Sequence, residues 1–303
     1  MSVEKIYTAD EIFNLNKTDQ IISSKAKDIE SNFYHYTTIS NVDKILSGDD
    51  KGNRFIFASN LLQMNDRNEA ERHKLNGDKI HSFCLCCTKH EKIPLWYLYS
   101  GICGNGARLG FTPGKMLKFI SNIDCVYPVK NGKVDYGIPL KKNVDFELQC
   151  GWVYYLMDGN NRIKYKNKFY AVEIISNDVL EDNLFVKDYP WEYEREFRIV
   201  IKNNTEIVYK RLAIPMPIDL IPSLEIMCAP EYEFNEIEKE KYISYGIKRE
   251  KIKKSALKIH MDLLHNNKLD ISSNIDKWCD DQQCEHICNY VKTRNQCQGG
   301  KLK

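Results

Sequence analysis

The sequence predicts an α+β protein built around one main core, and three observations lead to this fold class. Short runs rich in aromatic and β-branched residues, typical of strands, alternate along the chain with short amphipathic stretches of helical spacing. The length of 303 residues suffices for one large core or two modest ones. The sequence shows no internal repeat and no low-complexity linker, so one domain with extensions is the simplest arrangement.

The predicted strands share an enrichment in aromatic and β-branched residues. They are expected at 33–38, 54–59, 80–88, 106–111, 125–129, 134–138, 169–175, 196–202 and 224–229. The segment 196–202 has the strongest pattern. Its apolar face should carry Phe197, Ile199 and Ile201, because side chains alternate along a strand. The opposite face should carry Glu196, Arg198 and Val200.

The predicted helices are also short. One amphipathic stretch runs from Ala9 to Ile21, and a second helix has Ser40 or Asn41 as its cap and Gly48 as its end. Further helices are expected within 60–75, 94–101, 113–122 and 231–259.

These elements indicate three parts of the chain. Residues 1–30 form a polar lead-in, and residues 31–230 form the α+β domain. Residues 231–303 form a helical C-terminal extension that ends in a polar, cysteine-bearing tail. The charged face of this extension is typical of a helix side in contact with solvent.

Composition narrows the functional classes. The formal net charge of +2 argues against a strongly basic nucleic-acid-binding protein, while a local basic patch stays open. No apolar run approaches the roughly 20 residues that cross a bilayer, and the first residues lack the apolar stretch of a signal peptide. We therefore expect a cytoplasmic protein without a membrane partner. The eleven cysteines then indicate reduced thiols or metal ligands rather than a disulfide framework.

One candidate site is the predicted strand that contains His35, Tyr36 and Thr37. A histidine beside a hydroxyl can bind a ribose or an amide through two directional hydrogen bonds, and flanking aromatic rings can stack on a flat ligand. A purely structural histidine among tyrosines is the alternative.

Two further candidates have equally plain structural alternatives. Asn65 and Asp66 follow a strand, where they can contact a ligand or simply form a turn and cap a helix. Trp96 and Tyr99 can flank a ligand or belong to the core.

The most polar candidate is the segment that contains Glu194, Glu196 and Arg198. On one strand these three side chains would share a face, because the side-chain period is two. They can form a surface ladder of Glu and Arg. Alternatively, a carboxylate can face a ligand and stabilise a positively charged sugar while a glycosidic bond breaks.

Metal binding has only a weak signal. The possible zinc ligands in the C-terminal tail are Cys279, Cys284, His286 and Cys288. Their spacing lacks the paired CxxC knuckles of structural zinc sites, so zinc is not expected. The sequence also lacks a P-loop, a GxGxxG fingerprint, HExxH, GxSxG and the kinase motifs.

Taken together, these segments resemble one bacterial family, the domain of unknown function 2971. The resemblance lies in the order and spacing of several short motifs across about 33–202. The motifs are His35-Tyr36-Thr37, Asn65-Asp66, Phe83 to Thr88, Leu95-Trp96 with Tyr99, Gly106 to Phe111, and Trp191 to Ile199. The chain departs from the family pattern in CLCCT at 84–88 and in Leu95, where methionine is common.

The family layout is similar to that of ADP-ribosyltransferases, which implies split antiparallel sheets with flanking helices and NAD as the substrate. Under this analogy His35 would bind the nicotinamide ribose, with Thr37 beside it, and Ser59 would flank the nicotinamide. Glu196 would stabilise the cationic transition state, and Glu194 would position an acceptor. Residues expected around the nucleotide are His35, Tyr36, Thr37, Ser59, Asn65, Asp66, Trp96, Tyr99 and Arg198.

The resemblance therefore implies an NAD-dependent ADP-ribosyltransferase or NAD glycohydrolase, with an unknown protein or nucleic acid as acceptor. A toxin or a phage-defence effector is the biological role that goes with this family type. Two alternatives remain: a nucleotide-sensing module without catalysis, and a nuclease-like or RNA-modifying effector that uses His35, Arg198 and the basic segment 248–254.

Overall fold

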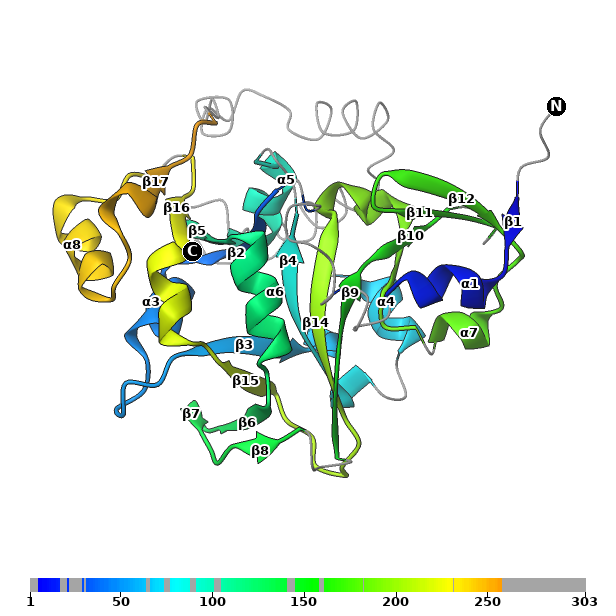
Figure 1. Ribbon diagram of the computed structural model, residues 1–303, viewed down its shortest axis with the longest axis horizontal. Helices are drawn as coiled ribbons and strands as arrows, with labels where there is room; N and C mark the ends of the chain where they lie inside the picture. Colours follow the sequence, from blue (N-terminus) through cyan, green and yellow to red (C-terminus); the bar gives the residue numbers. More distant parts are fainter. Residues whose placement is uncertain are drawn as a thin grey trace, which may run out of the picture. The chain divides into compact units, whose positions relative to one another are not determined.

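The protein is mixed α+β, as the sequence predicts (Figure 1). A computed structural model describes residues 5–16, 21, 29, 31–63, 66–73, 77–87, 91–100, 105–140, 145–157, 161–181, 183–230 and 232–257. The chain divides after Leu257, and the cysteine-bearing tail that follows lies outside the described residues. The first unit therefore includes the beginning of the expected C-terminal extension.

The described helices are short, with at most nine residues each. They are α1 (Ala9–Phe13), α3 (Ile39–Ser47), α4 (Arg67–Arg72), α5 (Ile93–Leu95), α6 (Pro113–Ser121), α7 (Asn177–Glu181) and α8 (Glu236–Ser244). Two other helical segments position the site, namely the π-helix η5 (Trp96–Ser100) and the 3-10 helix η7 (Tyr189–Glu194). In the described part of the chain, no helix is both long and apolar enough to pass through a membrane.

The larger sheet follows the order β17-β16-β5-β2-β4-β3-β15-β6-β7, and β14 pairs with both β4 and β9. Its strands are β2 (Phe33–Thr38), β3 (Phe55–Asn60), β4 (Ile80–Cys86), β5 (Gly106–Phe111), β6 (Cys125–Lys130), β7 (Lys133–Val134), β8 (Ile138–Pro139), β9 (Phe146–Trp152), β14 (Glu196–Asn203), β15 (Arg211–Pro215), β16 (Glu225–Cys228) and β17 (Ile252–Lys254). Except for the parallel pair β16 and β17, its pairings are antiparallel.

A smaller sheet has the order β1-β12-β11-β10-β13. Its strands are β1 (Ile6–Tyr7), β10 (Tyr154–Leu156), β11 (Arg162–Tyr165), β12 (Lys168–Val172) and β13 (Val186–Asp188). Of these strands, the sequence predicts only the segment that contains β12. The others have two to four residues each, too few to establish a clear alternation.

Strand β14 separates two apolar cores, as its alternating pattern predicts. Phe197, Ile199 and Ile201 belong to the larger core, whereas Val200 belongs to the core beneath the smaller sheet. Figure 1 shows β14 beside β4 and β9, its two pairing partners. With both faces buried, this strand holds its polar residues in a fixed, water-poor environment.

Helix α3 begins earlier than the sequence suggests. Its cap is Thr38, whose Oγ1 accepts a hydrogen bond from the backbone N–H of Asn41 at 3.3 Å. The expected cap, Ser40 or Asn41, was therefore wrong by two or three positions, because Thr38 is an equally good capping residue. The expected end is confirmed, since Gly48 follows the helix with a φ of 78°, which an L side chain rarely adopts.

Candidate active site

A cavity of about 1130 Å³ lies where strands β2 and β3 separate along one edge of β4. On that edge, β2 pairs at Cys86 and β3 pairs at Ser82 and His81. The opposite edge of β4 is fully occupied by β14. The β4 residues between the two pairings, Phe83 to Leu85, line the cavity. The cavity is thus a consequence of how the sheet opens.

The same strand register brings the motif around His35 close to the motif around Glu196. Tyr34 on β2 and Glu196 on β14 both pair with Cys86, from opposite edges of β4. Seven residues expected at the site line this one cavity. They are His35, Tyr36, Thr37, Ser59, Tyr99, Glu194 and Glu196.

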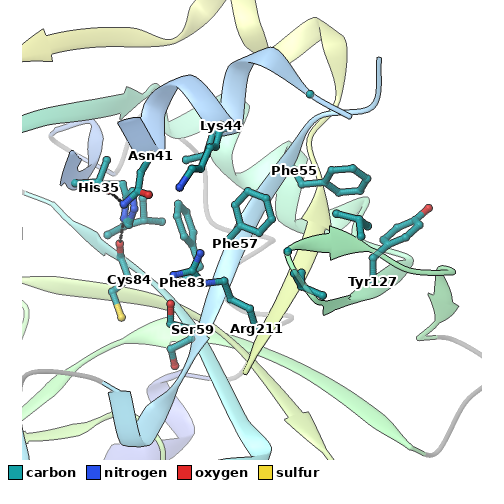
Figure 2. Close-up of a pocket in the computed structure, with 18 of the residues that line it drawn as sticks. His35, Asn41, Lys44, Phe55, Phe57, Ser59, Phe83, Cys84, Tyr127 and Arg211 are labelled. Carbon is teal, nitrogen blue, oxygen red and sulfur yellow. Dashed lines mark hydrogen bonds between the residues drawn. The ribbon is translucent and has the colours of Figure 1, made fainter. Parts of the chain in front are cut away.

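His35 is fixed by a hydrogen bond across the opening in the sheet. Its Nδ1 lies 2.9 Å from the carbonyl oxygen of Cys84, and its ring packs 4.6 Å from that of Phe83 (Figure 2). Burial lowers the pKa of His35, so the neutral ring is favoured. Because a carbonyl oxygen only accepts, Nδ1 carries the proton. Nε2 is then an acceptor, suited to a ligand hydroxyl.

The neighbouring residues of β2 differ in their availability. The Thr37 hydroxyl oxygen accepts a hydrogen bond from Nδ2 of Asn41 at 3.0 Å, and its own proton can still be donated. The Tyr36 hydroxyl accepts from Nη1 of Arg108 at 3.2 Å, and the Tyr36 ring packs against Trp96. Thr37 therefore has a donor left for a ligand, while the Tyr36 hydroxyl is held by Arg108.

Glu194 and Glu196 meet at a buried lysine. Nζ of Lys187 lies 2.6 Å from Oε2 of Glu194 and 2.8 Å from Oε2 of Glu196. The Tyr99 hydroxyl donates to Oε1 of Glu194 at 2.5 Å, which ties η5 to the end of η7. The backbone N–H of Glu196 donates to the Tyr155 hydroxyl at 2.7 Å. These contacts fix both carboxylates at the cavity wall.

The two glutamates do not lie on one strand, which corrects the expectation from sequence. Glu194 ends the 3-10 helix η7, and Glu196 begins β14. Between them Arg195 adopts the left-handed conformation, with a φ of 43°. This turn brings both carboxylates to Lys187, although the period-two argument for a shared strand face was wrong for Glu194.

Arg198 is a structural partner and does not line the cavity. Its side chain is fully buried and donates to both carboxylate oxygens of Glu69 and of Glu196. It also donates to the carbonyl of Leu184 at 2.9 Å. Arg198 therefore orients Glu196 from behind, rather than contacting a nucleotide as the sequence suggested.

The cluster of Glu69, Lys187, Glu194, Glu196 and Arg198 combines three acids with two cations. If all five ionise, one negative charge remains uncompensated in a buried place, which is unfavourable.

Protonation of Glu194 can remove this excess negative charge. Burial, reinforced by the negative charge of Glu196, outweighs Lys187 and raises the pKa of Glu194 to about 7. Burial also opposes ionisation of Glu196, but Arg198 and Lys187 outweigh it and hold its pKa well below the usual range. At neutral pH the site thus contains one permanently ionised carboxylate and one that exchanges a proton.

The remaining predicted residues have other roles. Asp66 caps α4, with one carboxylate oxygen 3.2 Å from the backbone nitrogen of Glu69, and does not line the cavity. Trp96 is buried, donates from Nε1 to Glu91 at 3.2 Å and also lies outside the lining. Asn65 lies outside the described residues. For Asp66 and Trp96, the structure shows the structural alternatives that the sequence left open.

Several important residues carry no sequence signal of their own. Lys187 completes the carboxylate cluster, Tyr155 binds the backbone of Glu196, and Lys44 and Arg211 line the cavity. None belongs to a recognisable motif, because each reaches the site through strand pairing or helix packing. A lysine between Val186 and Asp188 gave no basis for expecting a buried cation.

Metal ligation has no support in the described part of the chain, where no group of three or more His, Cys, Asp and Glu side chains could hold an ion. The possible zinc ligands Cys279, Cys284, His286 and Cys288 lie outside the described residues.

Comparison with protein-family models, curated proteins and solved structures finds no match for this chain.

Proposed function

We propose that this chain binds NAD and cleaves its nicotinamide–ribose bond, as an ADP-ribosyltransferase or an NAD glycohydrolase. One observation carries the proposal. The strand with His35 and Thr37 and the carboxylates of Glu194 and Glu196 line one cavity, on the two sides of β4.

The chemistry fits a site of this composition. When the bond to nicotinamide breaks, the ribose develops positive charge, which a fixed carboxylate can stabilise. The reaction needs a positioned ribose, but no covalent nucleophile on the protein. Glu196 is ionised and held from behind by Arg198, so it is preorganised for this role.

The remaining residues then have separate roles. Nε2 of His35 accepts from a ribose hydroxyl, and the Thr37 hydroxyl donates to the same sugar. Tyr99 holds Glu194, which receives a proton from the acceptor, either water or a nucleophile on a macromolecule. A pKa near 7 suits this exchange, because a group transfers protons best when its pKa is close to the working pH.

The opening of the sheet between β2 and β3 also supports the analogy with ADP-ribosyltransferases, whose layout has split sheets around NAD. The histidine-bearing strand β2 and the glutamate-bearing strand β14 flank one central strand. This likeness of layout raises the expectation of NAD chemistry.

The nuclease alternative has less support from its named residues. Arg198 is fully buried, and in the segment 248–254 three basic side chains pair with carboxylates. Arg249 contacts Glu236 and Glu240, Lys253 contacts Glu225, and Lys254 contacts Glu233. The nucleotide-sensing alternative uses the same cavity, and only turnover distinguishes it.

The test is to incubate the purified protein with NAD and to follow nicotinamide and ADP-ribose by chromatography, with and without cell extract. We expect nicotinamide release by the wild type and little by Glu196→Gln. Release without extract indicates transfer to water, and release only with extract indicates a macromolecular acceptor. Binding of NAD without release under either condition would contradict the enzyme proposal and support a sensor.

A further inference from the structure

The cavity continues beyond the carboxylates into a part lined by basic and aromatic side chains. Lys44 on α3 and Arg211 on β15 reach this part from two elements, with Phe57 of β3 beside them (Figure 2). Phe55 and Tyr127 also line this part, and the centroids of their rings lie 5.3 Å apart. This region lies next to Ser59, on the strand β3 that borders the opening.

The strand register explains why Arg211 faces the cavity. Arg211 pairs with Ser59, and Ala213 pairs with Phe57. Residues opposite each other in an antiparallel pair point to the same face, and positions two apart share that face. Arg211, Ser59 and Phe57 therefore belong to one surface. Lys44 follows Asn41 by one helical turn, so both residues of α3 reach the cavity.

Lys44 and Arg211 differ from the cations of the carboxylate cluster. Within the described residues, neither makes an ion pair or a side-chain hydrogen bond, whereas Lys187 and Arg198 each bind two carboxylates. A cation at a cavity wall that is not paired with a protein carboxylate is available to an anionic ligand.

The carboxylates on this side are engaged elsewhere or exposed. Both oxygens of Asp49 accept hydrogen bonds from its own loop, from Lys51 and Asn53. Asp135 pairs with Lys130 at 3.0 Å. Asp50 is exposed to solvent, as are Lys44 and Arg211 themselves. Among the described residues, none of these carboxylates forms an ion pair with Lys44 or Arg211.

We infer that Lys44 and Arg211 bind a diphosphate group and that Phe57 stacks on the adjoining adenine ring. The cavity then takes a dinucleotide with a diphosphate bridge, and the carboxylates face its far ribose. This inference rests on the proposed function, because it assigns the other half of the same nucleotide. A nucleoside without phosphates would contact neither cation.

The test is calorimetric titration with ADP and with adenosine, neither of which contains nicotinamide. We expect the wild type to bind ADP at least about tenfold more tightly than adenosine, because charge-assisted hydrogen bonds add to the affinity. Lys44→Gln combined with Arg211→Gln should weaken ADP binding by about 100-fold, roughly tenfold for each cation. Adenosine affinity should stay unchanged.

The matched control combines Lys202→Gln with Lys248→Gln. Both lysines are exposed and lie outside the cavity lining, and the control removes the same total charge. It should change ADP affinity by no more than about twofold, because distant exposed charges are screened. Arg211→Lys should retain part of the ADP affinity. Thermal unfolding of each variant confirms that the fold persists.

The inference is overturned if the cavity variant and the control bind ADP equally, or if the wild type prefers adenosine. Nicotinamide release gives an independent readout. If the protein releases nicotinamide but its ADP affinity does not depend on Lys44 and Arg211, the proposed function is retained and the diphosphate site is rejected. ADP binding that depends on both residues, without any release from NAD, would retain the site and reject the enzyme.

Discussion

Glu194 and Glu196 share one buried cation although they belong to different secondary-structure elements. Their carboxylates lie 2.6 and 2.8 Å from Nζ of Lys187, one from the end of η7 and the other from the start of β14. The left-handed backbone at Arg195 permits this convergence. The two carboxyl groups therefore form one electrostatic unit, in which the charge of each affects the protonation of the other.

Replacing the shared cation should destabilise the fold. Lys187→Met leaves two buried carboxyl groups without their common partner, and we expect a loss of about 3–5 kcal/mol in the free energy of unfolding. Urea denaturation at neutral pH measures it. Adding Glu194→Gln to this variant should recover part of the loss, because it removes one of the two carboxyl charges. A loss below about 1 kcal/mol would contradict the buried cluster.

Stability should fall with rising pH because of Glu194. Burial raises its pKa from the ordinary 4.5 to about 7, so the folded state holds this proton more tightly than the unfolded state. The resulting stability is fully present below pH 4.5 and is lost as the pH rises through about 7. The loss is on the order of 3 kcal/mol. Glu194→Gln lacks it, so parallel unfolding curves for the two proteins across this range would refute the assignment.

Removing the Tyr99 hydroxyl should alter how activity depends on pH. The hydroxyl donates to Glu194 and stabilises its ionised form, so Tyr99→Phe should raise the pKa of Glu194 further. If Glu194 must be ionised, kcat/KM for nicotinamide release decreases at low pH, and this limb should move upward by about one pH unit. Tyr170→Phe is the control, since Tyr170 lies on β12 of the smaller sheet, outside the cavity lining. Identical profiles for both variants would exclude the role of Tyr99.

Asp66 should affect stability alone. Asp66→Ala removes the cap of α4, which typically costs about 1 kcal/mol of stability. Asp66→Asn preserves a capping oxygen and should cost less. Neither change should affect nicotinamide release, because Asp66 does not line the cavity. A tenfold or larger loss of nicotinamide release in a folded variant would contradict this and indicate that Asp66 acts in the site. A tenfold loss corresponds to about 1.4 kcal/mol of transition-state stabilisation.

The parts of the fold that follow from sequence are those with a local pattern. The alternation in β14 predicts which side chains enter each core, and Gly48 predicts the end of α3. The helix cap was less certain, because Thr38, Ser40 and Asn41 all can cap a helix. The short strands β10 and β11 have no such pattern, since three or four residues are too few to show a clear alternation.

For the site, sequence indicates the residue types but not their convergence. His35 and Glu196 could be identified from their motifs, and both line the cavity. The contact of Glu194 with Lys187 depends on the left-handed conformation of Arg195. This conformation is uncommon for a residue other than glycine, so the sequence does not predict it. Arg198 was expected at the ligand because strand alternation gives a shared face, yet alternation does not say whether that face reaches a cavity.

The most direct test of the central claim compares Glu196→Gln with Glu69→Gln. Both carboxylates bind Arg198, but only Glu196 lines the cavity, so the second variant controls for damage to the buried cluster. The measurement is the rate of nicotinamide release from NAD at a pH and temperature where both variants are folded. The account predicts a loss of about 100-fold or more for Glu196→Gln and a loss within about threefold for Glu69→Gln. Equal rates for the two variants, or no release by the wild type, would contradict it.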